Sequence, residues 1–114
     1  MKDFEILITP DAEDNLRELR YYIAVVLQAP DTAIAYLQDI RKEIASLRKA
    51  PKRFRLVEKE PWHSRGVRRM NARNFAVFFI IREEESNVYV QNVIYQKRDL
   101  PKVLAKLYPH LGEL

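Results

Sequence analysis

Arginine is the residue type in this chain that points most directly to chemistry. A basic cluster spans nine residues and a basic pair follows later in the chain: Arg65, Arg68, Arg69, Arg73, Lys97 and Arg98. Guanidinium groups bind phosphate oxygens through two parallel hydrogen bonds, and a fixed cation stabilises charge that develops on a phosphoryl group. The cluster as a whole predicts a phosphate-binding patch. Any single arginine is more simply a solvated residue that pairs with Glu58, Glu60 or Glu83.

Three residues near these cations have side chains that can assist RNA chemistry. His63 can transfer protons, and its neighbour Trp62 can stack on a base, although such a pair more often packs a loop. Tyr95 stands beside Lys97 and Arg98 at the end of a predicted strand, where tyrosine is also an ordinary strand residue.

Several other site designs are excluded by residue type. With Gly66 and Gly112 as its only glycines, the chain has no glycine-rich phosphate loop and no serine between flanking glycines. His63 and His110 have no metal-ligand spacing. We therefore expect neither a cofactor nor a metal.

Composition favours one compact domain over residues 1–114, because 114 residues with 47% apolar content suffice for one core. The absence of cysteine suits a reducing compartment, and no apolar run is long enough to span a bilayer, so we expect a cytoplasmic protein without a membrane partner. The net charge is −2 over residues 1–50 and +6 over residues 51–114. The basic half favours a polyanion or an acidic protein as partner, and a solvated basic surface is the alternative.

Apolar spacing predicts a strand and two helices in the first half. Lys2 to Thr9 alternates as a half-buried strand, and Thr9 can cap a helix that starts at Pro10 and reaches about Leu27. Pro30 interrupts the pattern, and a second helical stripe then runs from Ala33 to Leu47. The connection is so short that the two helices should form an antiparallel hairpin.

The second half is β-rich. Lys52 to Trp62 has no period and predicts a surface loop, whereas short strands are expected at Val67 to Asn71, at Phe75 to Ile81 and at Val88 to Tyr95. Phe75 to Ile81 is unbroken apolar sequence, typical of a central strand. Asp99 is a good cap for a last helix, which Pro109 ends. We predict an α+β fold with an N-terminal strand, a helical hairpin packed on an antiparallel sheet, and a short C-terminal helix.

Four segments, in this order and spacing, resemble the RelE/ParE superfamily of bacterial toxins. They are Ile8 to Leu16, Tyr22-Ile23, Arg68-Arg69-Met70 leading to Asn74 to Phe79, and Tyr95 to Leu100. The resemblance runs over almost the whole chain. It implies the toxin of a type II toxin–antitoxin module, of the kind linked to plasmid stabilization, which a cognate antitoxin neutralises in a hetero-oligomer.

The resemblance leaves the target open between two branches. Ribonuclease members cleave mRNA on the ribosome with basic residues and often a tyrosine or histidine, and Arg69 and Arg98 match basic catalytic positions. In that reading Tyr95, His63 or Tyr108 handles the proton, while Arg65, Arg68, Arg73 and Lys97 bind the nucleic acid or another target. Members directed at DNA gyrase share the fold without the catalytic set.

Two departures favour the gyrase-directed branch. Ala76 stands where a nuclease member has an arginine, and Leu104 stands where it has a tyrosine. The long helical hairpin points the same way. A ParE-like toxin that acts by binding is the first hypothesis, a ribosome-dependent endonuclease the second, and a non-toxic domain that binds only an antitoxin the third.

Overall fold

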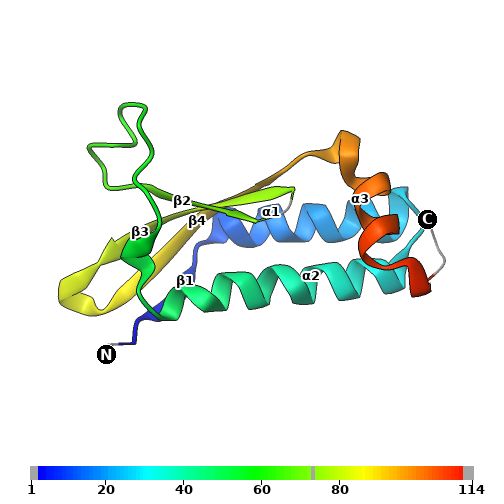
Figure 1. Cartoon of the computed structure of the whole chain (residues 1–114), viewed down its shortest axis with the longest axis horizontal. Coiled ribbons are helices and arrows are strands. Elements are labelled where there is room, and N and C mark those ends of the chain that lie inside the picture. Colours follow the sequence, from blue (N-terminus) through cyan, green and yellow to red (C-terminus); the bar gives the residue numbers. More distant parts are fainter. Residues whose placement is uncertain (1–2, 73, 112–114) are drawn as a thin grey trace.

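The computed structural model describes residues 3–72 and 74–111. The elements follow one another as expected: a strand, two helices, three strands and a short helix (Figure 1). Their bounds are β1 Glu5–Ile8, α1 Pro10–Tyr21, α2 Pro30–Ala45, β2 Arg68–Ala72, β3 Phe75–Arg82, β4 Asn87–Tyr95 and α3 Leu100–Leu107. The predicted α+β class is therefore confirmed. No helix in these two ranges is long and apolar enough to cross a membrane.

The four strands form one sheet in the order β1-β4-β3-β2. The pairs β2·β3 and β3·β4 are antiparallel, as their short connections require, and β3 is a central strand as predicted. β1 lies parallel to β4, so the sheet is mixed. The length of the connecting loops does not predict this orientation, because the whole helical hairpin and two further strands separate β1 from β4 in the chain.

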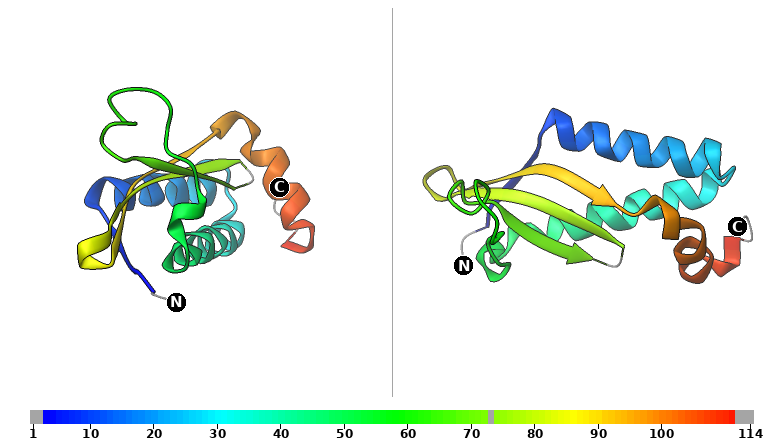
Figure 2. Two further views of the ribbon diagram at one scale, coloured as in Figure 1. Left: turned by 60° about the vertical axis from the view of Figure 1, so that its left-hand side comes forward. Right: turned by 90° about the horizontal axis from the view of Figure 1, so that it is seen from above.

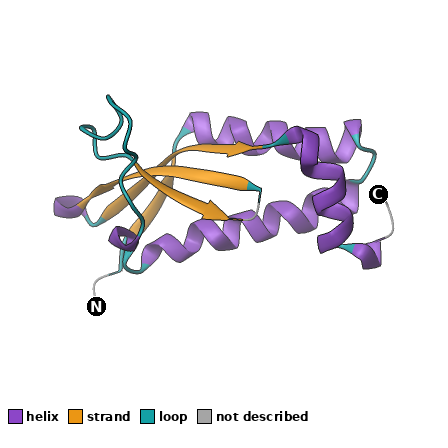
Figure 3. Ribbon diagram, turned by 45° about the horizontal axis from the view of Figure 1, so that its top comes forward, coloured by secondary structure: helices purple, strands orange, loops and turns teal. Residues whose placement is uncertain are grey.

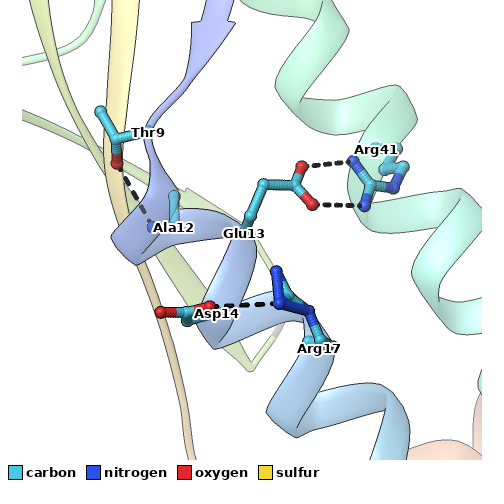
Figure 4. A network of polar contacts seen from close by, with 6 residues as sticks. All are labelled: Thr9, Ala12, Glu13, Asp14, Arg17 and Arg41. Carbon is cyan, nitrogen blue, oxygen red and sulfur yellow. Dashed lines mark hydrogen bonds and ion pairs between the residues drawn. The ribbon is translucent and has the colours of Figure 1, made fainter.

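The first helix begins as the sequence predicts. The Thr9 backbone is extended, and its hydroxyl accepts a hydrogen bond from the Ala12 amide at 3.3 Å (Figure 4). Regular α-helix ends at Tyr21, and one wider π-helical turn, Tyr22–Val26, carries the chain to Leu27. The expected end at about Leu27 therefore holds, with a change of helix type that apolar spacing alone does not reveal.

The two helices lie side by side and antiparallel on one face of the sheet (Figure 2). Pro30 occupies the first turn of α2, and Asp31 is a first-turn acid there. The Glu13 carboxylate accepts two hydrogen bonds from the Arg41 guanidinium, at 3.3 and 3.4 Å (Figure 4). This bridge is exposed to solvent, so it contributes at most about 1 kcal/mol, and packing of the apolar stripes holds the hairpin.

The core lies between this hairpin and the inner face of the sheet. Leu16, Leu19 and Ile40 from the helices are almost completely buried against Val77 and Phe79 of β3. A register shift at Phe78/Phe79 leaves Gln91 of β4 without a partner in β3. Because of this bulge, Val90 and Val93 both contribute to the core although three positions separate them.

The connection from α2 to β2 is mostly irregular, as expected, and longer than the predicted Lys52 to Trp62 segment. Two 3₁₀ turns, Ser46–Arg48 and Pro51–Arg53, follow α2, and Leu56 then forms an isolated bridge with Arg68. Beyond the bridge, residues 57–67 rise from the sheet on the side away from the helices (Figures 1 and 2). We call this segment the 57–67 loop.

The last helix is where expected, but the predicted cap is wrong in detail. Asp99 is the residue before the first turn of α3, yet its side chain makes no capping hydrogen bond. A 3₁₀ turn, Lys97–Asp99, precedes the helix and gives Asp99 a helical backbone, with φ −93° and ψ −8°. A capping side chain needs an extended backbone to reach back to the first amides. Instead Leu100 and Leu104, both fully buried, hold α3 on the core near the C-terminal end of β4 (Figure 3).

Candidate functional site

Arg69 lies on the outer face of the sheet, away from the helices. Its neighbour Met70 is buried and pairs with Val77 of the core, so side-chain alternation places Arg69 on the opposite face. Its guanidinium lies 5.4 Å from the centre of the Phe78 ring, and its Nε donates a hydrogen bond to Asn71 at 2.7 Å. These contacts fix an exposed cation above the sheet.

The other arginines of the cluster do not share this position. Arg68 is partly buried and donates hydrogen bonds to the carbonyl oxygens of Phe54 at 2.7 Å and Lys52 at 3.4 Å, so it ties the α2–β2 connection to β2. Arg65 is exposed on the 57–67 loop. Arg73 lies outside the described residues. Two of the acids that were expected to pair with these arginines have other partners: Glu83 pairs with Lys52, and Glu60 accepts a hydrogen bond from Ser64.

The 57–67 loop is held by its own hydrogen bonds. Glu60 accepts hydrogen bonds from the amide and the hydroxyl of Ser64, at 2.8 and 2.5 Å. The Val57 amide donates to Val67, and the Val67 amide donates to Trp62. His63 Nδ1 lies 2.9 Å from the carbonyl oxygen of Val57, so this ring contacts the loop backbone. The backbone at the tip is thus ordered although it projects into solvent.

This loop presents Trp62 together with Arg65. The Trp62 side chain is 46% exposed, and the Arg65 guanidinium lies 5.5 Å from the centre of its ring. Below the loop is a hollow of about 460 Å³. Its lining residues are Arg55, Leu56, Val57, Glu58, Lys59, Trp62, Arg69 and Asn71. Arg55, Lys59 and Asn71 were missed in the sequence, although alternation from Arg69 does predict that Asn71 shares its face.

A second hollow of about 380 Å³ adjoins Arg69 and Asn71 on the other side. It reaches Phe78, Ile94, Tyr95 and Gln96, so Arg69 and Tyr95 border the same space. Tyr95 pairs with Phe75 of the core and interacts with Glu18 and Tyr22 of the first helix. Burial, and then the Glu18 carboxylate, raise the pKa of Tyr95 above its usual value of 10.0. Its hydroxyl therefore stays protonated at neutral pH.

The basic pair after β4 lies elsewhere. The Lys97 ammonium is 5.3 Å from the centre of the Tyr22 ring, beside the first helix. Arg98 is exposed and lines neither of the two hollows. Arg69 and Tyr95 thus line one hollow from different faces of the sheet, because Tyr95 packs against the core beside Phe75, and Lys97 and Arg98 do not line it.

The two positions that depart from the nuclease pattern have different surroundings: Ala76 lines the hollow beside Arg69, whereas Leu104 belongs to the core. Ala76 is 5% exposed on β3, and Leu104 is 0% exposed in α3. Tyr108, a candidate for the proton transfer in the nuclease hypothesis, is 9% exposed, and its hydroxyl donates a hydrogen bond to the Asp39 carboxylate of α2. None of these positions offers a free polar group to the hollow beside Arg69.

The acid at the base of the loop gives a pH prediction. Hydrogen bonds from Ser64 lower the pKa of Glu60 below its ordinary value of 4.5. Because the folded-state pKa is depressed, the contribution of Glu60 to loop order is present above pH 4.5 and is lost as the pH falls through the folded value. An NMR titration should show the Ser64 amide shift changing with a midpoint below 4.5, and Glu60→Gln should abolish this step. A midpoint above 4.5 would contradict the bonds.

Residues 6–100 of the chain match the family described as "ParE toxin of type II toxin-antitoxin system, parDE". No curated protein matches the chain in sequence. The fold is similar to a chain in the crystal structure of the toxin-antitoxin complex RelBE2 from Mycobacterium tuberculosis, with a TM-score of 0.61, 16% identity, and coverage of 84% of this chain and 94% of that one. It is also similar to a chain of the chromosomal ParDE TA system from P. aeruginosa, with a TM-score of 0.62, 17% identity, and coverage of 82% and 97%.

Proposed function

Because the chain belongs to the ParE toxin family of type II toxin–antitoxin systems, within the RelE/ParE superfamily, we propose that it arrests growth by binding DNA gyrase. In this proposal the toxin acts in the cytoplasm by occupying its target, and it breaks no bond itself. The observation that carries it is the apolar character of the two positions where a nuclease member places an arginine and a tyrosine. Ala76 lines the hollow beside Arg69 but brings no cation to it, and Leu104 is buried in the core.

The state of Tyr95 supports the same proposal. A tyrosine that takes a proton from a ribose hydroxyl works best with a pKa close to the working pH. Burial moves the pKa of Tyr95 the other way, upward from 10.0. Arg98, the second matched basic position, does not border the hollow that contains Arg69 and Tyr95.

The alternative function is a ribosome-dependent mRNA endonuclease, favoured by the shared hollow of Arg69 and Tyr95. In this alternative Arg69 and Arg98 stabilise the charge on phosphorus in the transition state, and Tyr95 handles the proton. Because Ala76 stands where nuclease members have an arginine, the ribosome or the message would have to supply the missing group.

The partner in either case is a cognate antitoxin in a hetero-oligomer. Support comes from the free edge of the sheet: β1 is the outermost strand, and a hollow of about 570 Å³ separates it from α2. Phe4, Ile6, Ile8 and Ile44 are among its lining residues. An extended segment can pair with such an edge, and an apolar helix can occupy such a groove.

The test is to induce the chain alone in a bacterium and to assay the purified protein with gyrase. We expect growth arrest with intact transcripts, and loss of supercoiling activity as the toxin concentration rises. Tyr95→Phe should remain toxic, because a binding mechanism does not need the hydroxyl. Primer extension on several messages checks transcript integrity.

Two other results would replace this proposal. Codon-phased mRNA cuts that disappear in Tyr95→Phe or Arg98→Ala would establish the endonuclease. Induction without growth inhibition, while the chain still binds an antitoxin, would indicate a non-toxic binding domain.

A further inference from the structure

The end of the helical hairpin, where α1 turns into α2, exposes a group of apolar side chains. Among the described residues, six large apolar side chains are exposed to solvent, and four of them belong to this end: Tyr21, Val25, Val26 and Ile34. Their exposed fractions lie between 54% and 61%. We call these four residues the hairpin-end patch, and it lies at the opposite end of the molecule from the 57–67 loop (Figure 1). Single exposed apolar residues are ordinary, whereas a gathered set marks an interaction surface.

The backbone at this end turns apolar side chains outward. The Leu27 amide donates a hydrogen bond to the carbonyl oxygen of Tyr22 at 2.9 Å, which makes the turn π-helical and wider than an α-helical one. In an α-helix, residues three apart share a face. Here Ile23 is 0% exposed and Val26 is 56% exposed, so the wider turn separates them. The hydrogen bonds keep this backbone ordered, and association with a partner therefore does not have to order it.

The charges beside the hairpin-end patch are of both signs. Residues 21–30 contain no charged side chain, although 32% of the chain is charged. Arg20 and Asp31 stand directly on either side of this run, and both are exposed. In the part of the chain that the structure describes, neither of them forms an ion pair, whereas Arg17 and Arg41 each pair with a carboxylate. An apolar centre with one unpaired cation and one unpaired anion at its margin is complementary to itself.

We propose that the hairpin-end patch binds a second copy of this chain in a symmetric dimer. In a dimer with a two-fold axis the same surface is used by both copies, so Arg20 of one copy pairs with Asp31 of the other, and the reverse pair forms as well. Tyr21 and the two valines fill the centre, which lacks charge as the cores of interfaces do. A partner whose surface carries one sign of charge places a like charge against either Arg20 or Asp31. The second copy is therefore the occupant that fits.

This dimer goes beyond the proposed function, because it requires neither gyrase nor an antitoxin. The groove assigned above to the antitoxin is lined on α2 by Arg41, Ile44 and Ala45, whereas Ile34 lies about one turn from the start of that helix. The rise of an α-helix places Arg41 about 10 Å further along the axis than Ile34. The two surfaces are thus separate, and the dimer joins two toxin–antitoxin units.

Sedimentation of the purified full-length chain tests the association, at concentrations from about 1 μM to about 500 μM. Four side chains form a small interface, and small interfaces belong to weak, transient complexes. We therefore expect the average mass to rise with concentration from one chain towards two, with a dissociation constant in the micromolar range.

Charge placed in the patch should separate the copies. Val25→Asp puts like charges close to the two-fold axis and should weaken the dimer by about a hundredfold. Ile34→Asp tests the contribution of α2 in the same way. Ile94→Asp is the matched control, because Ile94 is 51% exposed but follows the core residue Val93 on β4 and so faces away from the hairpin. All three altered positions are exposed, so circular dichroism should show an unchanged fold.

Reversal of the marginal charges tests the orientation of the two copies. Arg20→Glu alone and Asp31→Arg alone should each weaken the dimer by about threefold to tenfold, because each change places like charges opposite one another. The double variant Arg20→Glu, Asp31→Arg exchanges the two charges and should restore most of the affinity. A residue that only supports the fold of its own helix is not rescued in this way.

Three results would overturn the proposal. A mass of one chain at every concentration would leave the patch to a different protein. A dimer that withstands Val25→Asp and Ile34→Asp but is lost in Ile6→Asp would place the contact at the edge strand β1. A double charge variant that dimerises no better than the single variants would remove the paired charges. A monomer that inhibits gyrase leaves the gyrase proposal standing, and a dimer without gyrase inhibition leaves this interface standing.

Discussion

Phe79→Ala is expected to lower the free energy of unfolding by about 4 kcal/mol, since removing a buried phenylalanine ring costs roughly 3–5 kcal/mol. Phe79 is 0% exposed in β3, between Arg68 of β2 and Val90 of β4. Its ring contacts Phe54 edge to face, with 6.1 Å between the ring centres. The strands on both sides are fixed by backbone hydrogen bonds, so they cannot close the cavity. Urea unfolding followed by circular dichroism measures the change.

The neighbouring residue provides the control. Phe78 is also a phenylalanine of β3, but it is half-buried on the outer face beneath Arg69. Phe78→Ala should lower the free energy of unfolding by only about 1–2 kcal/mol, because the Phe78 ring buries less apolar area on folding than the Phe79 ring does. Equal losses in the two variants would contradict the assignment of the rings to opposite faces of the sheet.

The second large effect is expected at the C-terminal helix. Leu104→Ala should destabilise the protein by about 3 kcal/mol, within the range for a buried leucine. α3 has eight residues, too few to be stable alone, so Leu100 and Leu104 hold it on the core. Urea unfolding gives the free energy, and amide hydrogen exchange should show α3 losing protection before the sheet does.

Two further variants define this effect. Lys102→Ala changes an exposed residue of the same helix and should alter stability by less than about 0.5 kcal/mol. Leu104→Tyr introduces the residue type of the nuclease pattern, and it should destabilise by about 1–3 kcal/mol through overpacking without producing mRNA cleavage. A fully stable Leu104→Tyr variant that cleaves mRNA would show that position 104 faces the site.

Residue types and their spacing were enough to predict α1, α2 and α3 and the strands β1 to β4. The Thr9-Pro10 start, the interruption at Pro30 and the apolar run after Asn74 each act through local backbone chemistry, and each marks a true boundary. The same local signals missed the π-helical turn at Tyr22–Val26 and the helical backbone of Asp99. Both deviations depend on what the chain packs against, which a local signal does not contain.

The site was predicted less completely than the fold. The basic cluster was identified, but its arginines divide between different tasks: Arg68 binds backbone carbonyls, while Arg69 stands exposed on the outer face. Adjacent residues of a strand point to opposite faces, so a count of arginines cannot assign them to one patch. Arg55 and Lys59 line the hollow below the 57–67 loop because the bridge between Leu56 and Arg68 brings this segment to the sheet.

The sequence by itself determined the α+β class, the order of the elements and membership of the toxin superfamily, because periodicity and motif order are properties of the chain alone. Only the tertiary structure decided that β1 pairs in parallel with β4, that Leu104 is core, and that Trp62 and Arg69 line one hollow. These facts depend on contacts between distant segments. Packing selects such contacts for the whole molecule at once, so no local pattern can specify them.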